Sequence, residues 1–215
     1  MRISLKSLAV PIVFALLIFV ALLTERNALF GKGVVEVKEH PNRHRTLIFA
    51  WYDDVKAPMA QRFEEAFDAH AGDADTIILD FNSKGGSLRE GQRVIEWIKR
   101  AKRTHRIESQ VQKRRSCLSM CVPIYLQGQL RRASGSSRWM FHEPRLVDAY
   151  TNEIADQPEF EKNWSSNRFF ERYFVNSEMD PDWRERLREK WVGKDVWYSG
   201  RDLVEQHSGV VQELM

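Results

Sequence analysis

The chain has 215 residues, of which 43% are hydrophobic and 29% are charged, and its formal net charge is +3. This length and balance predict one globular domain with a sizeable core, and they exclude a disordered or low-complexity chain. The mildly basic charge does not by itself indicate nucleic acid binding, so no nucleic acid partner is expected.

The first 26 residues have the pattern of a membrane-targeting segment. Arg2 and Lys6 precede an uncharged run at residues 8–23. No A-x-A site closes the run, which favours an uncleaved signal anchor over a cleaved signal peptide. Basic residues before the run place the N-terminus in the cytoplasm and the rest of the chain outside it. We therefore predict that residues 1–26 form a transmembrane signal anchor in contact with lipid, with secretion after cleavage as the alternative.

The remaining chain divides into residues 27–45, a linker with a first strand, and residues 46–215, a single domain. Strand-like and helix-like patterns alternate between residues 46 and 142, and this order predicts an α/β fold with a mainly parallel sheet. The expected strands are 34–38, 46–52, 76–81, 105–112 and 137–142, and the expected helices begin at Pro58, after Gly86 and at Ser119.

Residues 152–190 are both aromatic and highly charged, and we expect two helices with a break near residues 176–181. Helices of this composition pack against something, either the domain face or a neighbouring subunit. A short strand at 195–199, a helix capped by Ser199 or Gly200 and a terminal strand at 209–211 are expected to follow. The basic stretch 99–115 is expected to be a solvated surface, with contact to anionic lipid head groups as the second interpretation.

Ser119 is the candidate nucleophile, because a helix start offers unpaired N–H groups that stabilise an oxyanion. An ordinary N-cap serine is the alternative. His142 ends the next predicted strand, which a parallel sheet returns beside Ser119, so it is the candidate base. Asp195 is the candidate residue that orients His142, with a simple turn residue as the alternative. Gly86 and Met120 can each present a backbone N–H to a substrate carbonyl, as an oxyanion hole does.

Cys117 and Cys121 flank Ser119 by two residues on either side. An extracytoplasmic address permits a disulfide between them, but spacing of i and i+4 on one helix is marginal for bridging, so two buried thiols are the alternative. The sequence places no further cysteine or histidine at metal-ligand spacing, and neither a metal nor a cofactor is expected.

Four motifs in order resemble the ClpP-like serine peptidase family, within the ClpP/crotonase fold. They are N-S-K-G-G at 82–86, S-M at 119–120, F-H-E-P at 141–144 and D-V-W-Y-S at 195–199, and S-G-V-V at 208–211 also fits. The resemblance covers roughly residues 46–212. It implies repeated β-β-α units, a Ser119–His142–Asp195 triad, and an oxyanion hole from the Gly86 and Met120 amides. It also implies a peptide or protein substrate and a homo-oligomer built through a helical handle at 152–190, whose aromatic side chains are expected to be buried between subunits.

Three features depart from the cytosolic family pattern. Lys84 replaces the family's proline, and the N-terminal run and the paired cysteines are absent from the cytosolic enzyme. The N-terminal run and the paired cysteines resemble those of periplasmic ClpP-like proteins of bacteria, which implies a single-pass inner-membrane protein whose ATP-independent peptidase domain faces the periplasm. The alternatives are a non-catalytic ClpP-like scaffold of the cell envelope and a crotonase-type enzyme acting on a thioester.

Overall fold

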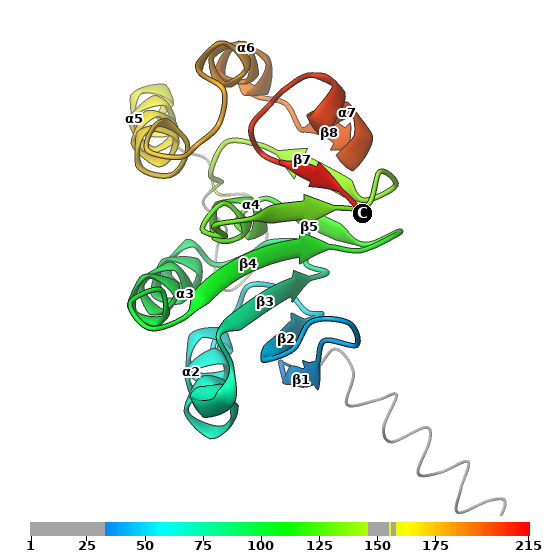
Figure 1. The fold of residues 1–215 in the computed structure, drawn as a ribbon. Helices are drawn as coiled ribbons and strands as arrows, with labels where there is room; N and C mark the ends of the chain where they lie inside the picture. The colour runs from blue at the N-terminus through cyan, green and yellow to red at the C-terminus, as the bar shows by residue number, and fades with distance from the viewer. Residues whose placement is uncertain (1–32, 146–154, 156–157) are drawn as a thin grey trace, which may run out of the picture.

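The computed structural model describes residues 33–145, 155 and 158–215 (Figure 1). The predicted signal anchor at 1–26 and the beginning of the predicted handle therefore lie outside the described residues. Within the described part of the chain, no helix is both long enough and apolar enough to cross a membrane.

The larger of two sheets has six strands in the order β1-β2-β3-β4-β6-β9. β1 runs antiparallel to β2, and all other neighbours in this sheet are parallel. The mainly parallel α/β architecture is therefore confirmed. The strands are β1 (Val35–Glu39), β2 (Thr46–Trp51), β3 (Thr76–Phe81), β4 (Arg106–Val111), β6 (Arg131–Ala133) and β9 (Glu213–Leu214).

Helices α2 (Met59–His70) and α3 (Leu88–Ala101) lie side by side against one face of this sheet (Figure 1). Phe63 of α2 packs between Trp51 and Trp97, with ring centroids 6.0 and 5.1 Å away. Burial of each such side chain stabilises the fold by about 1.5–3 kcal/mol. The Ser87 hydroxyl accepts a hydrogen bond from the Glu90 N–H and so begins α3 directly after the glycine loop.

A second, smaller sheet contains the strand that ends directly before Ser119. It consists of β5 (Ser116–Leu118), β7 (Arg138–Phe141) and β8 (Val196–Ser199) in the order β5-β7-β8. β5 and β7 are parallel, with Leu118 opposite Met140, whereas β7 and β8 are antiparallel. β5 and β6 were not predicted from the sequence, and the terminal strand lies at Glu213–Leu214 instead of the predicted 209–211.

The aromatic helical segment contains α5 (Glu159–Phe170), a π-helical turn η2 (Glu171–Val175) and α6 (Pro181–Trp191). Phe141 at the end of β7 contacts Phe174 and Trp183, with ring centroids 6.1 and 5.7 Å apart. Most of the aromatic side chains therefore pack within the same chain, and the expectation that they are buried between subunits is wrong. Phe160 and Trp164 stay exposed, at 72% and 61%.

Three short helices complete the described structure. They are η1 (Ala71–Asp73), α4 (Cys121–Tyr125) and α7 (Gly200–Glu205). As the sequence predicts, Ser199 caps α7, because its hydroxyl accepts a hydrogen bond from the Asp202 N–H. α4 is only five residues long, so the helix expected from Ser119 to Gly128 is shorter and begins two residues later.

Candidate active site

Ser119 stands in the turn between β5 and α4, and its hydroxyl faces His142. The Ser119 Oγ lies 2.8 Å from the His142 Nε2. The two residues meet because each directly follows the end of one of two paired parallel strands, and the Ser119 N–H donates to the Met140 carbonyl at 2.9 Å. Ser119 has a φ of 52°, a left-handed conformation that is uncommon for a residue with a side chain and that functional sites favour.

His142 is half-buried at the end of β7. Burial lowers the pKa of the imidazole from 6.5, and the Arg145 guanidinium lowers it further, while Asp195 and Glu143 act in the opposite direction. The lowered pKa favours the neutral imidazole, the form that can accept a proton at Nε2. Its Nδ1 is buried and has no hydrogen-bond partner among the described residues.

Asp195 lies immediately before β8, and its Oδ1 accepts a hydrogen bond from the Arg145 guanidinium. The structure describes no hydrogen bond between Asp195 and His142, although the carboxylate is close enough to raise the pKa of the imidazole. The predicted orienting contact is thus replaced here by an ion pair between two side chains that are each 38% exposed. The pairing of Arg145 with Asp195 was not predicted, because no sequence pattern links an arginine after H-E-P to an aspartate 50 residues later.

Glu143, the residue after His142, makes two hydrogen bonds that were not predicted from the sequence. Its Oε1 accepts a hydrogen bond from the Ser166 hydroxyl at 2.7 Å, and its Oε2 accepts one from the Gly193 N–H at 2.7 Å. One carboxylate therefore joins the end of β7 both to α5 and to the turn that carries Asp195. No spacing rule in the sequence could have identified these partners.

The glycine loop lies directly against the candidate nucleophile. A Cβ on Gly85 would fall 2.6 Å from the Ser119 Cβ and 3.0 Å from the Met120 N, and a Cβ on Gly86 would fall 2.5 Å from the Val55 carbonyl oxygen. Both glycines have positive φ values, 88° and 140°, which side chains disfavour. The close approach of this loop to Ser119 therefore requires glycine at position 85, and its close approach to Val55 requires glycine at position 86.

The backbone N–H groups of Gly86 and Met120, which the sequence predicts as oxyanion donors, lie in the glycine loop and directly after Ser119. Hydrogen bonds from Val55 to the Gly85 carbonyl and from Ser87 to the Val55 carbonyl, both 2.7 Å, fix the loop on either side of Gly86. Within the described residues, neither the Gly86 N–H nor the Met120 N–H donates a hydrogen bond. Both donors therefore lack an acceptor in the described chain; Gly86 is exposed, whereas Met120 is fully buried.

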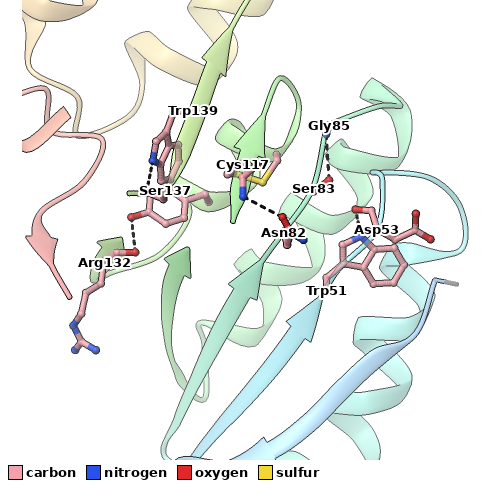
Figure 2. Close-up of a disulfide and its surroundings, with 12 residues drawn as sticks. Trp51, Asp53, Asn82, Ser83, Gly85, Cys117, Arg132, Ser137 and Trp139 are labelled. Atoms are coloured by element: carbon pink, nitrogen blue, oxygen red, sulfur yellow. Dashed lines mark hydrogen bonds between the residues drawn. A yellow bond between two sulfur atoms is a disulfide. The ribbon is translucent and has the colours of Figure 1, made fainter. Parts of the chain in front are cut away.

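Cys117 and Cys121 form a disulfide that brackets Ser119 (Figure 2). Cys117 belongs to β5 and Cys121 begins α4, so the two Cα atoms are only 5.2 Å apart. The assumption that both lie on one helix, which made the bridge marginal, is wrong. Both cysteines are at most 1% exposed. Figure 2 also shows the bridge beside the 82–85 loop, where the Ser83 hydroxyl accepts a hydrogen bond from the Gly85 N–H.

Across residues 33–145, 155 and 158–215, no three histidine, cysteine, aspartate or glutamate side chains gather as metal ligands would. The reactive groups that the described site brings together are the Ser119 hydroxyl and the His142 imidazole.

No protein-family model and no curated protein matches the sequence. Solved structures do match the fold. A point mutant of ClpP1 from Listeria monocytogenes aligns with a TM-score of 0.60 and 18% identity over 80% of this chain and 91% of that one. A point mutant described as the 1510-N membrane-bound stomatin-specific protease aligns with a TM-score of 0.58 and 13% identity over 77% of each chain. The chain therefore has the fold of the ClpP-like serine peptidases.

Proposed function

We propose that the chain is a serine peptidase in which Ser119 is the nucleophile and His142 is the general base. The observation that carries this proposal is the 2.8 Å contact between the Ser119 Oγ and the His142 Nε2. A serine hydroxyl is a weak nucleophile unless a base removes its proton during attack, and an imidazole of lowered pKa is neutral and able to do so. The ClpP-like fold makes a peptide bond the expected target.

In the first step, the Ser119 Oγ attacks the substrate carbonyl carbon while its proton moves to the His142 Nε2. The carbonyl oxygen becomes an oxyanion, which the Gly86 and Met120 N–H groups stabilise. The tetrahedral intermediate then expels the amine, which takes the proton from His142, and an acyl ester remains on Ser119. Water, deprotonated by His142, cleaves that ester and restores both side chains. None of these steps consumes ATP.

We place this peptidase outside the cytoplasm, on a bacterial inner membrane, attached by residues 1–26. Arg2 and Lys6 before the uncharged run support this orientation. The Cys117–Cys121 disulfide supports an oxidising compartment, because structural disulfides are rare in the cytosol. One of the solved structures that match the fold is itself described as membrane-bound.

We further propose that the chain forms a homo-oligomer. The support is the exposed aromatic pair Phe160 and Trp164 on α5, within the segment where the family resemblance implies a handle. Light scattering coupled to size-exclusion chromatography of the detergent-solubilised chain measures the mass directly. A monomer at micromolar concentration would contradict this part of the proposal.

A second candidate function has one specific observation in its favour. Asp195 is bonded to Arg145 instead of His142, as expected for a ClpP-like scaffold whose triad is not used for catalysis. The two candidates differ in the reactivity of Ser119, because only a working Ser–His pair makes the hydroxyl unusually nucleophilic.

Covalent labelling decides between them. The detergent-solubilised chain is treated with a fluorophosphonate probe, and the adduct is located by mass spectrometry. Labelling at Ser119 that is lost in both Ser119→Ala and His142→Ala supports the peptidase. Absence of labelling in folded protein, repeated in native membranes to retain any partner, supports the scaffold.

A further inference from the structure

A groove with an apolar floor and a basic rim lies between the first turn of α3 and helix α5. Its volume is about 240 Å³, which is smaller than a typical site for a drug-sized ligand and is suited to one or two amino-acid side chains. Its apolar and basic lining includes Leu88, Arg89, Pro144, Trp164, Arg168 and Arg172. Leu88 and Trp164 are 43% and 61% exposed, so apolar surface is available within the groove.

The groove adjoins the candidate active site on two sides. Leu88 is two residues beyond Gly86, and Pro144 is two residues beyond His142. Two residues of chain span at most about 7 Å, so the groove begins within about two substrate residues of the reacting carbonyl. A side chain of a bound peptide that extends from the oxyanion hole toward α5 therefore reaches it.

The rim of the groove carries positive charge, and the described residues that line the groove include no aspartate or glutamate. Arg89, Arg168 and Arg172 have no ion-pair partner within the described part of the chain. The Arg168 guanidinium carbon lies 4.9 Å from the Trp164 ring centroid, and that of Arg172 lies 5.7 Å from the Tyr173 ring centroid. Such stacking holds a guanidinium above an aromatic surface and leaves its N–H donors free to bind an anion.

We propose that this groove selects peptide substrates with an acidic side chain next to an apolar one, within about three residues of the cleaved bond. The apolar side chain packs on Leu88 and Trp164, and the carboxylate pairs with the arginines of the rim. This inference rests on the proposed peptidase function, and it adds the class of substrate. Guanidinium groups bind carboxylates in a two-pronged geometry, whereas a neutral amide of the same shape gains no charge attraction.

Two quenched fluorogenic peptides of the sequence Gly-Ser-Leu-X-Leu-Ser-Gly, with X as Glu or Gln, test the selection. We expect the detergent-solubilised full chain to cleave the Glu peptide with the higher kcat/KM, by about two- to fivefold for each arginine engaged. Arg168→Gln and Arg172→Gln should lower the Glu-to-Gln ratio, and about 0.5 M salt should lower it as well. Arg103→Gln, which removes an exposed arginine in the turn after α3, is the matched control and should keep the ratio.

A binding measurement separates this inference from the proposed function. Fluorescein-labelled forms of the same peptides are titrated into Ser119→Ala protein, and the dissociation constants are compared by anisotropy. Tighter binding of the Glu peptide, lost in Arg168→Gln, supports the groove even if no peptide is cleaved. Equal binding of both peptides overturns it even if Ser119 labels with the fluorophosphonate. A drop in oligomer mass on Arg172→Gln substitution, with equal binding of both peptides, would identify the groove as a subunit contact and also overturn the inference.

Discussion

Replacing Arg145 tests how the His142 imidazole is oriented. In the structure Asp195 is bonded to Arg145, and the buried Nδ1 of His142 has no partner among the described residues. If Nε2 accepts the Ser119 proton, Nδ1 carries the imidazole hydrogen and is a buried donor left unsatisfied. The change Arg145→Gln removes the competing cation and leaves Asp195 free to bond Nδ1.

The size of the expected change in Ser119 reactivity follows from two opposing free energies. An unsatisfied buried donor costs about 1–3 kcal/mol. The Arg145–Asp195 ion pair joins two side chains that are each 38% exposed, and pairs this exposed are worth about 0.2–1 kcal/mol. The two ranges meet near about 1 kcal/mol, so the observed pairing with Arg145 fits a transfer of Asp195 to His142 that is close to balanced. Removing the ion pair should raise the fraction of oriented His142, and hence the reactivity of Ser119, by up to about fivefold.

The assay is the rate constant of fluorophosphonate labelling at Ser119, measured from about pH 4.5 to 8.5, a range that brackets the titration of histidine. Only neutral His142 acts as a base, so labelling rises with pH through the pKa of His142, below 6.5 in the parent chain. Loss of the Arg145 charge should shift this rise to higher pH, because Arg145 lowers that pKa. Asp195→Asn should shift the rise to lower pH and slow labelling on the order of a thousandfold.

The control is Arg201→Gln, which breaks an exposed ion pair with Glu205 on α7 and should change neither rate nor pH profile. If Arg145→Gln slows labelling more than about fivefold, Arg145 supports the reactive geometry and does not compete with His142 for Asp195. If Asp195→Asn is labelled at a rate within a factor of a few of the parent rate, Asp195 does not orient His142.

Three further predictions concern the elements around the site. Cys117→Ser with Cys121→Ser should lower the free energy of unfolding by about 2 kcal/mol, because the disulfide closes a short loop, and it should also slow labelling at Ser119. An unchanged urea midpoint together with an unchanged labelling rate would contradict this. Gly85→Ala should cost at least about 2 kcal/mol, because its Cβ would clash with the Ser119 turn, whereas Gly72→Ala, with no neighbour within 4 Å, should cost little; equal costs would refute the argument. Alkaline phosphatase fused to the C-terminus should be active if residues 5–24 span the membrane with the N-terminus inside, and an inactive fusion would reverse that topology.

The strands and helices predicted from the sequence are those with a strong local pattern. β3 is buried at all six positions, and α3 combines a capping serine with regular apolar spacing. β5, β6 and β9 were missed because strands of two or three residues have no periodicity to detect. They exist because neighbouring strands supply their hydrogen bonds, and that information is not local.

The same distinction applies within the site. The proximity of Ser119 and His142 was predicted from a single parallel sheet, whereas the structure brings them together through β5 and β7 of the second sheet, and β5 was not predicted. The Arg145–Asp195 pair was not, since it joins two exposed side chains whose rotamers no sequence pattern fixes. The disulfide was left open because its spacing was judged on an ideal helix, whereas α4 begins only at Cys121.

The two sides of the candidate site differ in how firmly they are held. Ser119 is fixed by buried contacts with the Met140 carbonyl, the Gly85 backbone and the disulfide around it. Asp195 is held by an exposed ion pair, whose strength is at most about 1 kcal/mol. A perturbation of that size cannot rearrange the nucleophile, but it can move the carboxylate between Arg145 and His142. The orientation of His142 is therefore the step of the proposed reaction that a bound substrate or partner can most easily change.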